Sequence, residues 1–274
     1  MFKKNYYCLV AGLPDLFFNE NKTGFSCLDF KNELQFQLNN SDLELAKIFY
    51  LKYDNQNLLN LLFEKNEPFH LLGNYKEEFL ENQIIKPDEV PDYMACFLKW
   101  AKNQETLELN LQVENKLQSL YYEYALTSKN SFLHEWFAFE QNIKNIITAF
   151  NCKQFYYSPE KHLILTSINT TVYSLLINKR LKTEFFEDEL PFADQIFRIS
   201  ESNSGIEERE KAMDKIRWEF LDERTFFHYF TIENILSYII KLDLVERWMK
   251  LDIETGKTLL MKLIEDIKLS YTFP

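Results

Sequence analysis

The sequence pairs histidine with acidic residues at two places, and such pairs are a common start of a metal site. His134-Glu135 begins like a zinc-protease motif, but Ala138 stands where the second histidine ligand is needed. Glu67-x-x-His70 matches half of a di-iron helix-bundle motif, which needs two such pairs, and Pro68 disfavours a helix interior there. Because both motifs are incomplete, we predict no metal-ligating residues.

Motifs for phosphate binding and nucleophilic catalysis are also incomplete. Gly256-Lys257-Thr258 ends like a phosphate-binding loop, but Leu251 occupies the upstream glycine position. The sequence contains neither GxGxxG nor GxSxG. The carboxylates of Glu207, Glu210 and Asp214 share a helical face, which is more typical of a solvated surface than of a cation site. We therefore predict no catalytic and no cofactor-binding residue, and a protein that is not an enzyme.

The elements that would position such residues are predicted to be helices. Glycine occurs 5 times and proline 7 times in 274 residues, which is too few turn residues for a many-stranded sandwich or barrel. The 31 Lys and Arg against 42 Asp and Glu give a net charge of −11, and the basic residues are scattered, which disfavours nucleic-acid binding. No apolar run reaches the ~20 residues of a membrane span, and the four cysteines are widely spaced, as in reduced proteins. We expect a mainly α-helical, cytoplasmic protein without direct membrane insertion.

Capping residues and apolar periodicity predict where the helices begin and end. Ser41–Glu44 forms a capping box, Asp54 is predicted to cap a following segment, and Ser131 is predicted to cap a later helix. At Tyr6–Ala11 we expect a short strand, followed by a turn at Gly12–Asp15. The other predicted helices begin near Asn74 and Pro91 and cover 105–128, 158–180, 207–222, 226–250 and 254–269.

An internal echo suggests that these helices form repeated units. Four polar identities recur between Gln56–Asn66 and Gln141–Asn151, around apolar pairs at the same offsets, and a looser copy begins at Asn234. One interpretation is a helical lobe present three times, in which Asn57, Asn142 and Asn234 are equivalent structural positions that anchor the neighbouring backbone. The other interpretation is chance, in a chain rich in Asn, Leu and Ile.

The echo divides the chain into possible lobes at 1–104, 105–182 and 207–274. The stretch 183–206 contains Pro191 and clusters of acidic and small polar residues, and it is predicted to be an acidic linker. Together the lobes and the linker are expected to form a single multi-lobed helical unit over residues 1–274.

Three stretches carry a family resemblance. They are Tyr6–Asp15, which includes the turn residues Leu13, Pro14 and Asp15, and then Phe49–Leu59 and Lys215–Glu223. In these stretches the chain resembles an uncharacterised bacterial family, a domain of unknown function, whose genes lie among those of V-type ATPases. The motifs are signatures of a family and not of a reaction.

A second resemblance rests on the motif Asp-x-x-Asn-apolar-x-x-apolar-apolar, which residues 54–62 fit. The motif is similar to one repeated in the C subunit, also called d, of V-type ATPases. In the second copy Phe139 stands at the Asp position, and Phe230–Tyr238 is similar to the last lobe of that subunit. The chain departs from the subunit by lacking its Arg-rich first helix and the basic residues that close each motif.

The resemblance implies a funnel of three related helical lobes that sits on the membrane rotor ring and grips the central shaft. The implied function is that of a non-catalytic coupling subunit, with the shaft subunits and the ring of a V-type ATPase as partners. It also implies a cytoplasmic location, peripheral to the inner membrane through these partners. An acidic funnel would suit a basic shaft end.

Two alternatives stay open from the sequence. One is a helical ligand-binding or metal-binding protein, or a hydrolase, that uses a pocket between lobes. Glu67, His70 or the acidic segment 184–194 would then supply the polar lining. The other is a helical scaffold unrelated to the ATPase.

Overall fold

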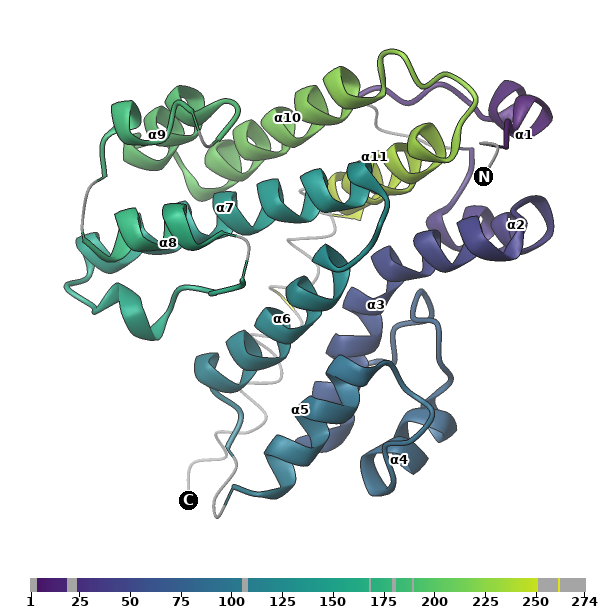
Figure 1. Ribbon diagram of the computed structural model, residues 1–274, viewed down its shortest axis with the longest axis horizontal. Coiled ribbons are helices and arrows are strands. Elements are labelled where there is room, and N and C mark those ends of the chain that lie inside the picture. Colours follow the sequence, from purple (N-terminus) through teal and green to yellow (C-terminus); the bar gives the residue numbers. More distant parts are fainter. Residues whose placement is uncertain are drawn as a thin grey trace. The chain divides into compact units, whose positions relative to one another are not determined.

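A computed structural model describes residues 4–18, 24–104, 108–167, 169–178, 181–188, 190–250 and 261. Within these residues every regular element is a helix, which confirms the predicted mainly α-helical fold (Figure 1). The α-helices are α1 (Tyr7–Gly12), α2 (Cys27–Gln37), α3 (Asn40–Leu62), α4 (Glu77–Ile85), α5 (Asp92–Lys102), α6 (Leu111–Leu126), α7 (Ser131–Gln154), α8 (Thr170–Ile177), α9 (Ala193–Glu201), α10 (Ile206–Thr225) and α11 (Ile232–Lys250). Two short 3-10 helices cover Pro159–Lys161 and Thr183–Phe185.

The chain divides into two compact units. The larger unit comprises Leu38–His228 and contains α3 to α10, and the smaller unit combines Met1–Gln37 with Tyr229–Pro274. These units differ from the predicted lobes 1–104, 105–182 and 207–274, because the two ends of the chain belong to one unit. A common origin of the predicted lobes stays a prediction.

Helix α7 is the central element of the larger unit. It packs against α6, α8 and α9, and its aromatic side chains reach two further helices. Phe137 stacks on Phe49 of α3 with 5.5 Å between ring centroids, and Phe139 stacks on Phe220 of α10 at 4.0 Å. In Figure 1, the axes of α3, α5 and α6 are nearly parallel, with α6 running back along α5, whereas the axes of α7 and α10 lie at an angle to them. Burial of these rings removes large apolar areas from water and fixes α7 in its place.

The smaller unit brings the first two helices together with α11. Helix α2 packs against α11, where Phe30 meets Tyr238 edge-on with 4.9 Å between ring centroids. The Tyr238 hydroxyl donates to the carbonyl of Pro14 at 3.0 Å, and the N–H of Tyr6 donates to the carbonyl of Phe230 at 2.7 Å. These bonds tie the chain before and after α1 to the α11 segment.

Asparagine side chains, and not serine, begin the two longest of the described helices. The Asn39 side chain accepts the N–H of Asp42 at 3.0 Å and donates to the Asp42 carboxylate at 2.8 Å, so the cap of α3 lies two residues before the predicted cap at Ser41. Asn130 accepts a backbone N–H in the first turn of α7 at 3.0 Å, one residue before the predicted cap at Ser131. In each case the amide oxygen satisfies an N–H that has no partner within the helix.

The predicted short strand over Tyr6–Ala11 is wrong, because these residues lead into and form α1. Of the turn expected at Gly12–Asp15, Gly12 ends α1, Leu13 is extended, and Pro14 and Asp15 lie exposed outside any helix. The predicted helix over 158–180 is also interrupted, since a 3-10 turn, an irregular segment and α8 share this stretch. The predicted helix over 254–269 lies almost wholly outside the described residues.

The stretch 183–206, predicted to be a solvated linker, contains helix α9. Phe186 and Ile196 are fully buried, and Phe197 is nearly so. Phe197 contacts Phe150 of α7 edge-on at 5.3 Å between ring centroids. Acidic residues alternate with these apolar ones, so the composition resembles a linker while the apolar positions pack on α7.

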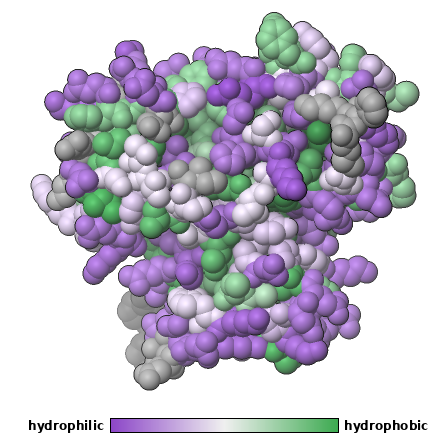
Figure 2. Space-filling model, viewed as in Figure 1, coloured by the Kyte–Doolittle hydropathy of each residue, from purple (hydrophilic) through white to green (hydrophobic). Residues whose placement is uncertain are grey.

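No helix among the described residues is long and apolar enough to cross a membrane. On the face drawn in Figure 2, hydrophilic residues cover most of the surface and hydrophobic residues form scattered patches.

Candidate functional site

The Asp54 and Asn57 side chains hold the segment 70–75 against α3, and we call this arrangement the first clasp. Asn57 Nδ2 donates to the carbonyl of His70 at 3.0 Å, while Asn57 Oδ1 accepts the N–H of the same residue at 2.8 Å. The Asp54 carboxylate accepts three bonds, from the backbone and side-chain nitrogens of Asn74 at 2.8 and 2.9 Å and from the N–H of Tyr75 at 3.0 Å. Asp54, predicted to cap a new helix, thus lies inside α3 and is fully buried.

Gly73 allows the segment to approach the clasp so closely. A Cβ atom at this position would lie 2.5 Å from Asp54 Oδ1 and 3.2 Å from Asn57 Nδ2. Real Cβ atoms do not come within 3 Å of other heavy atoms, so only glycine fits without a shift of the buried carboxylate.

A second clasp occurs on α7, where Gln141 and Asn145 hold Ile164, Thr166 and Asn169. Asn145 Nδ2 donates to the carbonyl of Ile164 at 2.7 Å, and Asn145 Oδ1 accepts the N–H of Ile164 at 2.8 Å. Gln141 donates to the same carbonyl at 2.9 Å and accepts from Thr166 Oγ1 and Asn169 Nδ2, both at 2.9 Å. The Asn145 amide of α7 therefore pairs with both backbone groups of Ile164, as the Asn57 amide of α3 pairs with both backbone groups of His70.

The three predicted repeat positions make different contacts. Asn57 forms the first clasp, but Asn142 does not form the second: its Oδ1 is buried and has no hydrogen-bond partner among the described residues. The bidentate role belongs to Asn145, three residues later. Asn234 lies near the start of α11, where its Nδ2 donates to the carbonyl of Tyr229 at 2.7 Å in an exposed setting.

A buried ion-pair cluster joins α7 to α10 beside the second clasp. Arg217 Nε lies 2.8 Å from a Glu140 carboxylate oxygen, and Arg217 Nη1 lies 3.0 Å from Asp214 Oδ1. Burial by itself would raise the pKa of Glu140, but the positive charge of Arg217 and its hydrogen bonds outweigh burial and lower this pKa below its ordinary value. Burial lowers the pKa of Lys144 although Glu140 acts in the opposite direction. Asp214 therefore serves an internal ion pair, and not the exposed acidic face predicted for it with Glu207 and Glu210.

The histidine and acidic pairs singled out in the sequence do not form a site. Glu67 is exposed, whereas His70 packs on the ring of Tyr53 with 4.2 Å between centroids. Glu135 forms an ion pair with Arg224 at 3.1 Å. Over the described ranges, no group of three or more His, Cys, Asp or Glu side chains could hold a metal ion.

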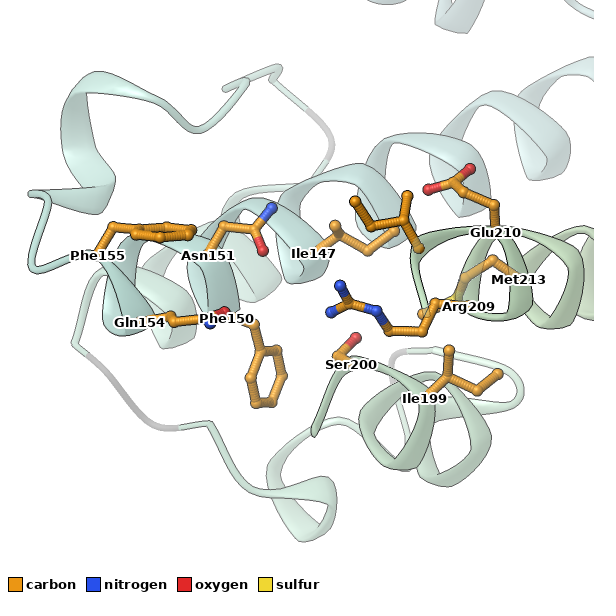
Figure 3. Close-up of a pocket in the computed structure, with 11 residues that line it drawn as sticks. Ile147, Phe150, Asn151, Gln154, Phe155, Ile199, Ser200, Arg209, Glu210 and Met213 are labelled. Carbon is orange, nitrogen blue, oxygen red and sulfur yellow. The ribbon is translucent and has the colours of Figure 1, made fainter. Parts of the chain in front are cut away.

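A cavity of about 330 Å³ lies between α7, α9 and α10 in the larger unit (Figure 3). Its apolar walls include Ile147, Phe150, Ile199 and Met213. Arg209 enters it from the first turns of α10, and its guanidinium extends into the space between α7 and α9 in Figure 3.

Asn151 and Gln154 of α7 and Ser200 of α9 add polar groups to the same wall. Sequence reasoning missed this cavity because the residues come from three helices, one of them in the predicted linker. The signal that could have found it is the apolar spacing of Ile196, Phe197 and Ile199 in that stretch.

Comparison with known proteins identifies a family for the chain. No curated protein and no solved structure matches it. A family model described as "Protein of unknown function (DUF2764)" matches residues 3–270, which is nearly the whole sequence. The matched range includes both clasps, the ion-pair cluster and the cavity. Because the match covers nearly the whole sequence, the chain belongs to this family of unknown function.

Proposed function

We propose that the chain is a non-catalytic coupling subunit of a V-type rotary ATPase that links the central shaft to the membrane rotor ring. The observation that carries the proposal is the recurrence of the clasp. Two long helices, α3 and α7, each hold a following segment through a buried amide that pairs with the N–H and the C=O of one residue. The first of these amides belongs to the motif at residues 54–62 that resembles the repeated motif of the V-type ATPase C subunit.

The physical properties of the clasps suit a part that transmits force. A residue whose N–H and C=O both bond to one buried side chain resists sliding along the helix, because any displacement leaves several polar groups unpaired. The first clasp adds three bonds to a buried carboxylate. Torque transfer between two partners needs such stiff connections and broad contact surfaces, and it needs no reactive side chain.

The charge of the chain supports a basic partner. A net charge of −11 would attract the basic end of a shaft and speed its association at low salt. The exposed aromatic residues Phe36, Tyr156 and Phe227, each more than four-fifths exposed, would supply apolar contacts in an assembled complex.

Reconstitution with the ATPase subunits from the same genome tests the proposal. We expect the full-length chain to co-purify with the shaft subunits at micromolar concentration, and to associate more slowly as the salt concentration rises. A complex assembled without the chain is expected to hydrolyse ATP without pumping ions. If no complex with the shaft forms, or if pumping is equal with and without the chain, the proposal is rejected.

A further inference from the structure

We infer that the cavity between α7, α9 and α10 binds a small amphiphilic anion, with an apolar body and a carboxylate or phosphate head. The inference does not depend on the proposed role in a rotary ATPase, since it concerns the isolated chain. It rests on one unpaired cation, on the character of the spaces on either side of it, and on the amides that face it.

The cation is Arg209, whose Nε atom is buried and has no hydrogen-bond partner among the described residues. No carboxylate of the described residues lies within the 4.0 Å of an ion pair with this side chain. Leaving a buried guanidinium donor unpaired is costly, and native proteins usually satisfy such groups with protein, water or a bound ligand. A bound oxyanion would satisfy it with charge-assisted bonds.

The other arginines of α9 and α10 are paired. Arg217 bonds to Glu140 and Asp214, and Arg198 lies 2.5 Å from a carboxylate oxygen of Asp194. Arg209 thus differs from its neighbours on α9 and α10 in lacking an acidic partner within the described residues.

Arg209 stands at the border of two spaces of opposite character. On one side is the cavity of about 330 Å³, with walls that include Ile147, Phe150 and Met213. On the other side is an adjoining cleft of about 630 Å³, which Lys153 and the segment Glu201–Ser204 line. The smaller cavity falls within the range of small-molecule sites, roughly 300–1,000 Å³.

This arrangement matches a ligand with two ends. An aliphatic or aromatic body would occupy the apolar cavity, and an anionic head would lie at Arg209 with access to Lys153 across the polar cleft. The side-chain amides of Asn151 and Gln154 face the same space and would donate further bonds to the head.

The acidic residues near the site do not neutralise Arg209. In Figure 3 the Glu210 carboxylate points away from the Arg209 guanidinium, and its negative charge acts on Arg217, whose pKa it helps to raise. Glu201 is exposed on the polar cleft, where water screens its charge.

Binding of two simple amphiphiles to the purified full-length chain tests the inference. Isothermal titration and ligand-detected NMR with octanoate and with octyl phosphate distinguish the two possible heads, and octylammonium reports on purely apolar binding. We expect at least one of the two anions to bind and octylammonium not to bind. Octanoate alone would identify a carboxylate site, and octyl phosphate alone a phosphate site.

Two variants locate the ligand. Arg209→Gln is expected to weaken binding of the anion about tenfold or more, because it removes the charge-assisted bonds. The matched control Arg198→Gln changes an arginine of α9 that lies in an exposed ion pair outside the cavity, and it is expected to bind as the wild type does.

A third variant, Ile147→Trp, fills the apolar cavity and keeps the test valid if Arg209→Gln does not fold. It is expected to abolish binding while circular dichroism shows unchanged helix content. The inference is overturned if neither anion binds at millimolar concentration, if octylammonium binds equally well, or if Arg209→Gln or a folded Ile147→Trp retains wild-type affinity.

Discussion

Both clasps hold a following segment against a long helix, but the first uses a charged side chain, Asp54, where the second uses a neutral one, Gln141. On α3 a buried carboxylate, Asp54, sits one helical turn before Asn57 and accepts three bonds from Asn74 and Tyr75. On α7 the neutral Gln141 sits one turn before Asn145 and exchanges donor and acceptor bonds with its segment. The comparison teaches that the amide pairing to one backbone residue is the shared element, whereas the second side chain is variable.

The location of the charge differs as well. In the first clasp the buried charge is part of the clasp, but on α7 it lies on the adjacent residue Glu140, which pairs with Arg217 of α10. The first clasp holds the segment 70–75 against α3. The α7 region fixes a segment through neutral groups and a second helix through an ion pair.

The largest expected difference between the clasps comes from deleting the variable side chain. Asp54→Ala leaves three donors of a part-buried segment without this acceptor, and we expect it to lower the free energy of unfolding by about 4 kcal/mol. Gln141→Ala removes neutral bonds, and we expect a loss of about 2 kcal/mol. Urea denaturation of both variants at pH 7 measures the difference. Equal losses would show that the charge of Asp54 adds nothing to the clasp.

The ion pair beside the second clasp is expected to make α7 sensitive to acid. Glu140→Gln leaves the buried Arg217 with Asp214 as its remaining described acidic partner, which we expect to cost about 3 kcal/mol at pH 7. Because the pKa of Glu140 is lowered in the folded protein, its contribution is complete above the ordinary value of 4.5 and is lost as the pH falls below it. The difference between wild type and variant should therefore shrink below pH 4.5 in urea titrations.

An exposed ion pair provides the control for this prediction. Glu135 pairs with Arg224 at 3.1 Å, and both side chains are 43% exposed. Glu135→Gln is expected to change stability by less than about 1 kcal/mol. A similar loss in both variants would contradict the assignment of Glu140 as a structural partner of Arg217.

The shared amides are expected to be equivalent in energy. Asn57→Ala leaves the part-buried N–H and C=O of His70 without this partner, and Asn145→Ala leaves the buried N–H of Ile164 without it while Gln141 still donates to the Ile164 C=O. We expect each variant to cost about 2.5 kcal/mol. Hydrogen exchange should show faster exchange at the N–H of His70 in the first variant and of Ile164 in the second. A large inequality would break the parallel between the clasps.

A substitution at Gly73 tests the first clasp from the segment that Asp54 and Asn57 hold. Gly73→Ala places a Cβ atom 2.5 Å from Asp54 Oδ1, and the shift this forces is expected to cost about 2 kcal/mol. In the double variant with Asp54→Ala the cost should largely disappear, because the two sites share one contact. Gly12→Ala, which meets nothing within 4 Å, is the control for the glycine-to-alanine change itself.

The sequence allowed the fold class and the first clasp to be predicted in part, since helical periodicity and the motif at residues 54–62 are local signals. Asn145 was missed for a physical reason. Positions three residues apart lie on the same helical face, so Asn142 and Asn145 both place an amide on the same side of α7. The repeated sequence pattern does not tell which of the two corresponds to Asn57. Which of the two reaches Ile164 depends on the path of the segment that follows.

Long-range packing explains the other differences. Helix α9 was not predicted because its capping signal is absent: Phe192 precedes it in a left-handed conformation, with φ of 61°, and makes no side-chain cap. Its helical state is supported by burial of Ile196 and Phe197. The cavity at Arg209 combines residues from α7, α9 and α10, and no local pattern indicates that those three helices meet.

The smallest expected loss of stability is that of Asn142→Ala, and its comparison with Asn145→Ala tests which of the two residues forms the second clasp. Asn142 is 5% exposed, and its Oδ1 lacks a hydrogen-bond partner among the described residues. Asn142→Ala removes an unsatisfied acceptor, which offsets part of the packing that it loses, so we expect a cost of about 1 kcal/mol or less. The nearly isosteric Asn142→Leu should be neutral or stabilising, whereas Asn145→Leu should destabilise. If urea denaturation instead gave Asn142→Ala the larger loss of the two alanine variants, Asn142 would be the true counterpart of Asn57, and the assignment of the second clasp to Asn145 would fail.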